Sequence, residues 1–113
     1  MRTGEKVKVL TIDDLTPLIG KKVIVDGNEI GIFLTESGHI HAIHNVCPHK
    51  QGPLSEGTVS GEYVYCPLHD QKIDLASGEV QEPDEGCVTV YPVEVIDGDV
   101  YVCLQPMVAR YIL

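Results

Sequence analysis

The amino-acid sequence predicts an all-β protein of stacked antiparallel sheets, with one small lobe that holds a metal site. Short runs rich in Val, Ile and Tyr alternate with turns of Gly, Asp and Asn, and almost no segment has the apolar period of a helix. A chain of 113 residues is long enough for one hydrophobic core but not for two. We therefore expect a single domain over residues 1–113, with the lobe at about residues 47–75.

The first half of the chain predicts strands that are bounded by tight turns. Lysines alternate with Val7 and Val9, as in a half-exposed strand, and Thr11 with the acids after it can begin a short helical turn. An Asp-Gly-Asn turn then joins two apolar runs, which is typical of a hairpin. The expected elements are a strand at Lys6–Val9, a helical turn at Thr11–Leu15, strands at Lys22–Val25 and Glu29–Leu34, and a strand at His39–His44.

The second half repeats this pattern in shorter units. Gly61 separates two short runs as a tight hairpin, and Ser77-Gly78 and Asp97-Gly98 mark two further turns. The expected strands are Thr58–Ser60, Glu62–Tyr65, Lys72–Leu75, Glu79–Val80, Val88–Val95 and Asp99–Cys103.

Two short clusters of metal-ligating residues flank the Gly61 hairpin. One contains Cys47 and His49, the other contains Cys66 and His69, and each therefore offers one thiolate and one imidazole. Zinc sites of the Cys₂His₂ type usually pair their ligands by kind, so a mononuclear zinc site is the less favoured alternative. The mixed pairs suit a [2Fe–2S] cluster in which two Cys bind one iron and two His bind the other. We expect Cys47, His49, Cys66 and His69 to bind this cluster.

The ligand clusters resemble the cluster-binding loops of Rieske proteins. The resemblance lies in the runs Cys47–Leu54 (CPHKQGPL) and Cys66–Asp70 (CPLHD). Further stretches are similar to the small subunit of assimilatory NAD(P)H-dependent nitrite reductases, and the likeness extends over roughly residues 23–104. It implies the Rieske-type fold, and a partner that is a large catalytic subunit holding flavin, an iron–sulfur cluster and sirohaem. The stretches that carry this second likeness are Leu54–Gly61, Gln81–Val88 and Tyr91–Gly98.

Comparison with Rieske proteins of respiratory complexes predicts a low reduction potential. Those proteins have an extra Cys in each loop, joined as a disulfide, and hydroxyl groups bonded to the cluster. The matching positions here are Gly52 and Leu68 for the Cys pair, and Gln71 and Ile73 for the hydroxyl donors. With fewer positive dipoles aimed at the sulfurs, we expect a potential toward the lower end of the roughly −150 to +300 mV Rieske range.

The net charge of −9 argues against binding to nucleic acid or to an anionic membrane, because both need a basic surface. No segment resembles a secretory signal, and no apolar run approaches the about 20 residues that span a bilayer. We therefore expect a cytoplasmic protein with a redox partner protein, and no contact with nucleic acid or membrane.

Several other residues have plainer interpretations. Cys87 and Cys103 lie in apolar runs, where we expect buried thiols that act as small hydrophobic groups. The three histidines of the predicted strand 39–44 are interpreted as polar strand residues, with His44 a weak candidate for supporting the cluster. Lys50 and the apolar tail 107–113 could each face a partner, although solvent exposure of Lys50 and packing of the tail on the chain's own sheet are the simpler interpretations. Pro83 lies in a loop that resembles the proline-bearing loop covering the cluster in related proteins, but the second proline common there is missing, which does not favour a covering role.

The sequence favours electron transfer over catalysis. It has neither a Gly-rich phosphate loop nor a nucleophile–base pair outside the metal ligands, and a four-coordinate iron has no open position for a substrate. The first hypothesis is the electron-transfer subunit of nitrite reductase, a redox carrier that is not itself catalytic. The alternatives are a freestanding Rieske ferredoxin for a ring-hydroxylating dioxygenase, and a cluster-free docking or structural module.

Overall fold

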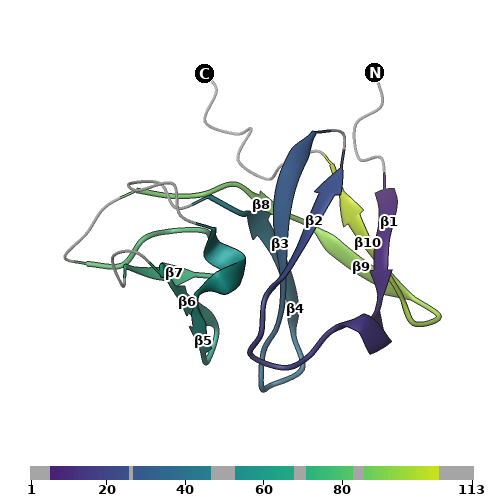
Figure 1. Cartoon of the computed structure of the whole chain (residues 1–113), viewed down its shortest axis with the longest axis horizontal. Coiled ribbons are helices and arrows are strands. Elements are labelled where there is room, and N and C mark those ends of the chain that lie inside the picture. The colour runs from purple at the N-terminus through teal and green to yellow at the C-terminus, as the bar shows by residue number, and fades with distance from the viewer. Residues whose placement is uncertain (1–5, 26, 47–52, 68–70, 83–85, 105–113) are drawn as a thin grey trace.

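The computed structural model describes residues 6–25, 27–46, 53–67, 71–82 and 86–104, and these form three antiparallel sheets. The four-stranded sheet has the order β2-β3-β4-β8, the second sheet has the order β1-β10-β9, and the third has the order β5-β6-β7. Figure 1 shows the four-stranded sheet between the other two. The strands are β1 (Lys6–Thr11), β2 (Lys21–Val25), β3 (Asn28–Leu34), β4 (Ile40–His44), β5 (Thr58–Ser60), β6 (Tyr63–Tyr65), β7 (Lys72–Asp74), β8 (Val90–Tyr91), β9 (Val93–Ile96) and β10 (Asp99–Cys103).

The all-β prediction is therefore confirmed, and the only helices among the described residues are two 3-10 turns. The first, η1 (Ile12–Asp14), lies at the predicted helical turn, and the Asp14 carboxylate accepts a hydrogen bond from the Thr11 backbone N–H. The second, η2 (Leu54–Glu56), was not predicted. Neither turn is long enough to cross a membrane, and this holds for every helix in the described part of the chain.

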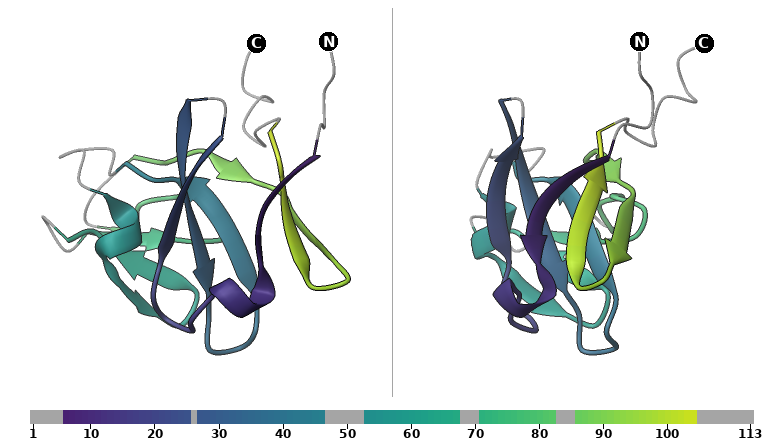
Figure 2. Two further views of the ribbon diagram at one scale, coloured as in Figure 1. Left: turned by 45° about the vertical axis from the view of Figure 1, so that its right-hand side comes forward. Right: turned by 90° about the vertical axis from the view of Figure 1, so that its right-hand side faces the viewer.

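The central strands of the four-stranded sheet, β3 and β4, have buried residues on both faces, whereas the edge strand β2 is largely exposed. Along β3, Ile30 and Ile32 contribute to the core beneath the sheet β1-β10-β9, whereas Phe33 contributes to the core beneath the sheet β5-β6-β7. Successive residues of a strand point to opposite faces, so one strand supplies both cores. The views in Figure 2 show the resulting layers, with the two smaller sheets on either side. We call η2 and β5–β7 the small lobe, and the sheets β2-β3-β4-β8 and β1-β10-β9 the framework.

Residues 88–95 differ from the single strand that the sequence predicts. The structure has two strands, β8 in the four-stranded sheet and β9 in the sheet with β1 and β10, and Pro92 lies between them. Proline has no N–H to donate to a sheet, so it ends the first pairing and lets the chain change sheets. Residues 79–80 form only isolated bridges, Ile73 with Val80 and Glu79 with Cys87.

The prediction of two buried thiols at Cys87 and Cys103 is wrong. Cys87 is exposed and Cys103 is half-buried, while their neighbours Val88 and Val102 are buried. The alternation of an extended chain explains the difference, because each Val takes the inward face and leaves the adjacent Cys on the other face.

Candidate metal centre

The described residues that flank the two predicted ligand loops lie at one end of the small lobe's sheet. Thr58 of β5 pairs with Tyr65 of β6, and Tyr65 pairs with Lys72 of β7, so these residues form one row across the sheet. The strand β5, which follows the first predicted loop, begins at this row. The strand β6 ends at the row and β7 begins at it, and the second predicted loop connects these two strands. The tight β5–β6 hairpin thus places the end of the first predicted loop next to the start of the second, although the two are far apart in the sequence.

Close backbone packing holds the ends of these loops together. A side chain at Gly57 would collide with the carbonyl oxygen of Tyr65, so the backbone of the segment after η2 lies directly on β6. Val46 and Pro53 form a bridge at the base of the first loop. At the base of the second loop, the Cys66 backbone N–H donates to the Gln71 carbonyl oxygen at 2.9 Å.

Asn45 connects the first loop to both the framework and the lobe. Its side-chain amide donates to Glu29 Oε2 of β3 and to Ser55 Oγ of η2, both at 3.0 Å. Its Oδ1 accepts a hydrogen bond from the Ser55 backbone N–H at 2.6 Å. Asn45 is fully buried, so these bonds replace the water that its amide loses on folding. Asn45 therefore fixes where the chain enters the first loop, next to Val46.

Of the four predicted ligands, the described residues include Cys66. Its side chain is fully buried at the end of β6, in the apolar core of the lobe with Leu54, Val64, Ile73 and Leu75. Cys47, His49 and His69 lie outside the described residues, as do Lys50, Pro83 and the tail 107–113. A buried thiol and a shared end for two loops fit a metal centre with two thiolates and two imidazoles. The four-ligand assignment therefore stays a prediction.

Two of the described residues, Gln71 and Ile73, match the positions that carry hydroxyl donors in respiratory Rieske proteins, and both are buried in the lobe. Gln71 is 4% exposed and Ile73 is fully buried, and neither has a hydroxyl group. The other compared positions, Gly52 and Leu68, lie outside the described residues. The low reduction potential therefore stays a prediction.

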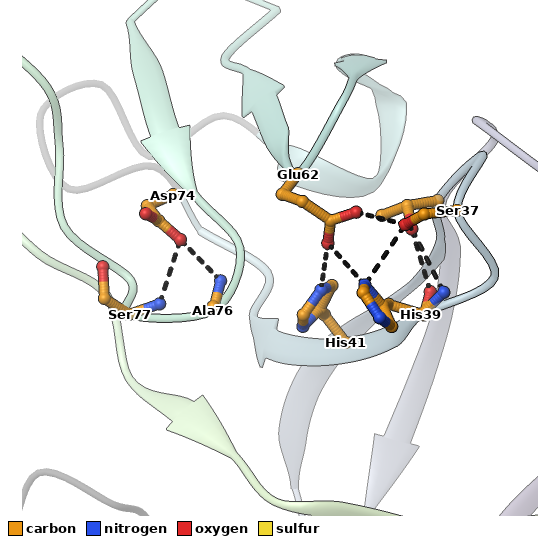
Figure 3. Close-up of polar contacts among 8 residues, drawn as sticks. Ser37, His39, His41, Glu62, Asp74, Ala76 and Ser77 are labelled. Carbon is orange, nitrogen blue, oxygen red and sulfur yellow. Dashed lines mark hydrogen bonds and ion pairs between the residues drawn. The ribbon is translucent and has the colours of Figure 1, made fainter.

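A second polar cluster was not found from the sequence. His39 and His41 were interpreted as ordinary strand residues, yet both rings reach Glu62, which lies in the turn between β5 and β6 (Figure 3). Hydrogen bonds from Ser37 and His41 lower the pKa of Glu62 from 4.5 to about 2. The available signal was the spacing of two His at positions i and i+2 of a strand, which places both on one face. Glu62 could not be linked to them before the fold was known.

His44 lies on the other face of the same strand. Within the β3–β4 ladder it pairs with Ile30, which belongs to the core beneath β1-β10-β9, whereas His41 pairs with Phe33 on the lobe face. The His44 backbone N–H donates to the Thr89 carbonyl oxygen at 2.9 Å.

Comparison with known proteins gives a family match over most of the chain. The family model for the Rieske-like [2Fe-2S] domain matches residues 5–103. The naphthalene 1,2-dioxygenase ferredoxin component of Pseudomonas putida is 32% identical over 74 residues, which are 65% of this chain and 70% of the ferredoxin. A 4beta-methylsterol monooxygenase of Methylococcus capsulatus is 40% identical over 73 residues, but the matched part is only 20% of that enzyme.

Solved structures of two kinds resemble the whole fold. A protein described as a nitrite reductase NADPH small subunit has 30% sequence identity and a TM-score of 0.78, over 87% of this chain and 97% of that chain. The ferredoxin of carbazole 1,9a-dioxygenase from Nocardioides aromaticivorans also has 30% identity, with a TM-score of 0.80 over 90% of this chain and 98% of that chain. The comparisons therefore agree on the fold and the cluster, and divide between two kinds of redox partner.

Proposed function

Because the chain belongs to the Rieske-like [2Fe-2S] domain family, we propose that it is the electron-transfer small subunit of an assimilatory NAD(P)H-dependent nitrite reductase. As a member of this family, the chain is a Rieske-type electron-transfer domain, and its cofactor is a Rieske [2Fe–2S] cluster. When bound, this cluster supplies one-electron transfer. Cys47, His49, Cys66 and His69 are the residues that would hold it.

The residues of the lobe serve this role by positioning the ligands. The apolar core around Cys66 keeps water from its side chain, and Asn45 fixes the start of the first ligand loop. The row of paired residues at the end of the lobe sheet brings the flanking segments of both loops together. These features reduce the rearrangement that would accompany a change of charge at the centre.

The observation that supports nitrite reductase is the likeness of three stretches outside the ligand loops. They are Leu54–Gly61, Gln81–Val88 and Tyr91–Gly98, and the similarity to nearly the whole length of a nitrite reductase small subunit agrees with it. The partner in this proposal is a large subunit with flavin and sirohaem that reduces nitrite to ammonium. A cytoplasmic location remains part of the same proposal.

The second candidate is a freestanding ferredoxin that donates electrons to a ring-hydroxylating oxygenase. It is favoured by the ferredoxin components among the sequence relatives and by the carbazole dioxygenase ferredoxin among the structures. The physical role of the chain is the same in both candidates, and only the partner differs.

The test is reconstitution with each kind of partner. We expect the purified chain to bind the sirohaem-containing large subunit and to support its NAD(P)H-dependent reduction of nitrite, and Cys47→Ser to abolish this support. Cys87→Ser is the matched control, because Cys87 is exposed and is not a predicted ligand. Failure to bind the large subunit, together with efficient electron delivery to a dioxygenase, would replace the proposal by the ferredoxin candidate.

Redox titration provides an independent check. Because Gln71 and Ile73 bring no hydroxyl to the lobe, we expect a midpoint potential below zero, near the lower end of the roughly −150 to +300 mV range of Rieske centres. A value well above zero would mean that other dipoles in the lobe raise the potential.

A further inference from the structure

We propose that His39, His41 and Glu62 form a second metal site, separate from the predicted cluster ligands, that takes a divalent zinc ion and joins the small lobe to the framework. Two histidines and one carboxylate are the ligand set of many tetrahedral zinc sites, in which water fills the fourth position. Imidazole nitrogens also favour zinc over Mg²⁺ or Ca²⁺, which prefer oxygen ligands.

The three side chains already converge on one point. His41 Nε2 lies 2.8 Å from Glu62 Oε1, and His39 Nδ1 lies 3.4 Å from the same oxygen. The three ligand atoms are all within 4.8 Å of one another. Zinc with bonds of about 2.0–2.1 Å to N and O needs ligand atoms about 3.3 Å apart in a tetrahedron. Small side-chain movements would therefore suffice, and the ion would replace the hydrogen bond between His41 and Glu62.

The ligands come from elements that hold them in place. His41 lies in β4 on the lobe-facing side of the four-stranded sheet, and His39 immediately precedes this strand, with its carbonyl oxygen accepting a hydrogen bond from the Thr35 backbone N–H at 2.9 Å. Glu62 lies in the two-residue connection between β5 and β6, and its carbonyl oxygen accepts a hydrogen bond from the Leu75 backbone N–H at 2.9 Å. The strand β4, the residue immediately before it and the tight β5–β6 hairpin thus supply the three ligands.

Hydrogen bonds behind the ligands orient them further. Ser37 Oγ donates to Glu62 Oε2 at 2.6 Å, which leaves Oε1 toward the two histidines (Figure 3). Ser37 Oγ also lies 3.0 Å from Oγ1 of Thr35, whose side chain is buried. Outer partners of this kind fix the carboxylates of metal sites and are worth about 10- to 100-fold in affinity.

The exposure of the ligands suits an ion that enters from solvent. The His39 side chain is 66% exposed and that of Glu62 is 36% exposed, whereas that of His41 is only 17% exposed. An ion can therefore reach the site past His39 and be held at its inner side by His41. Because the histidines belong to the framework and Glu62 to the lobe, bound zinc would tie the two together.

The test is zinc binding by the protein with its cluster assembled. Isothermal titration with Zn²⁺ should show one site, and His39→Ala should lower the affinity at least about tenfold, since even outer partners contribute that much. His39 is exposed, so this variant should fold normally; Glu62→Gln should behave alike. His44→Ala is the matched control, because His44 lies on the opposite face of β4.

Zinc K-edge absorption identifies the ligands directly, and it does not detect the iron. The proposal expects two imidazoles and oxygen ligands, with no sulfur, in a protein whose visible spectrum is unchanged by zinc. Zinc–sulfur distances near about 2.3 Å would place the ion at cysteines and overturn the proposal. Equal affinity in the wild type and His39→Ala, or no binding in the wild type, would overturn it as well. None of these outcomes depends on the identity of the redox partner.

Discussion

The framework and the small lobe are both antiparallel sheets, but they are stabilised differently. The framework has strands of up to seven residues, and its central sheet is covered on both faces. Each strand of the lobe has three residues, which is the short end of the range for strands in globular proteins. The lobe is joined to the framework by a shared apolar core, which includes Phe33 of β3 and Ile43 of β4, and by the hydrogen bonds between Asn45 and Ser55. From this difference we expect the framework to supply most of the stability and the lobe's sheet to position the ligands.

Substitution of a predicted cluster ligand should have the largest effect on both cofactor content and stability. Cys66→Ser should remove the visible absorption of the cluster and destabilise the lobe by at least about 4 kcal/mol, because loss of a metal site is among the most damaging single changes. Cys87→Ser should leave both absorption and stability unchanged, since Cys87 is exposed. Visible spectra and thermal unfolding of the two variants measure the difference. Similar spectra would show that the lobe does not need Cys66.

Matched substitutions in the core of the lobe and the core of the framework test whether the two regions unfold independently. Ile73→Ala in the lobe and Ile32→Ala in the framework each remove the same buried atoms, and each should cost about 2–5 kcal/mol. We expect Ile73→Ala to speed hydrogen exchange in β5–β7 alone, because the lobe can open locally. Ile32→Ala should speed exchange in all three sheets. Equal exchange profiles for both variants would mean that lobe and framework unfold as one unit.

The link between the two regions can be broken at Asn45. Asn45→Ala removes the bonds to Glu29 and Ser55 and should cost about 1–3 kcal/mol, because buried partners are left without hydrogen bonds. The variant should also lose its cluster faster than the wild type when an iron chelator is added. Asn28→Ala, at an exposed position in β3, is the control and should change stability by less than about 0.5 kcal/mol. Unfolding in denaturant measures both.

The smallest expected effect concerns pH and Glu62. Its pKa is lowered from 4.5 to about 2, so its carboxylate stabilises the fold fully above pH 4.5 and loses this effect as the pH falls toward 2. The carboxylate is about one-third exposed, so we expect only about 1 kcal/mol.

The measurement compares unfolding of the wild type and Glu62→Gln between pH 7 and pH 2, with a chelator present. The stability difference should shrink across the acid range, and Glu56→Gln, exposed in the same lobe, gives the baseline. A difference that is constant with pH would contradict the role of the carboxylate charge.

Much of the fold could be predicted because turns are encoded locally. The hairpins around Gly27, Gly61 and Gly98 lie where the sequence predicts them, and each of these glycines has a positive φ, which non-glycine residues rarely adopt. The change of sheet at Pro92 was missed because the apolar pattern continues across it, although the missing N–H was visible in the sequence.

Only the part of the site whose residues lie in short sequence motifs could be predicted. The spacing of Cys and His predicted the cofactor, and the family match confirms the [2Fe–2S] cluster. The group of His39, His41 and Glu62 depends on the packing of the β5–β6 turn against β4, a contact between distant segments that no local pattern encodes. Burial of both faces of β3 was not predicted, although an apolar run without alternation, such as the one in this strand, is the sequence signal for it.

The most direct test of the central claim is EPR spectroscopy of the anaerobically purified protein after reduction with dithionite. The account predicts a red-brown protein with a rhombic Rieske-type signal, present in the wild type and in Cys87→Ser and absent in Cys47→Ser and His69→Ala. A colourless protein that holds a single zinc ion through its cysteines, even after cluster reconstitution, would contradict electron transfer and leave a structural or docking module.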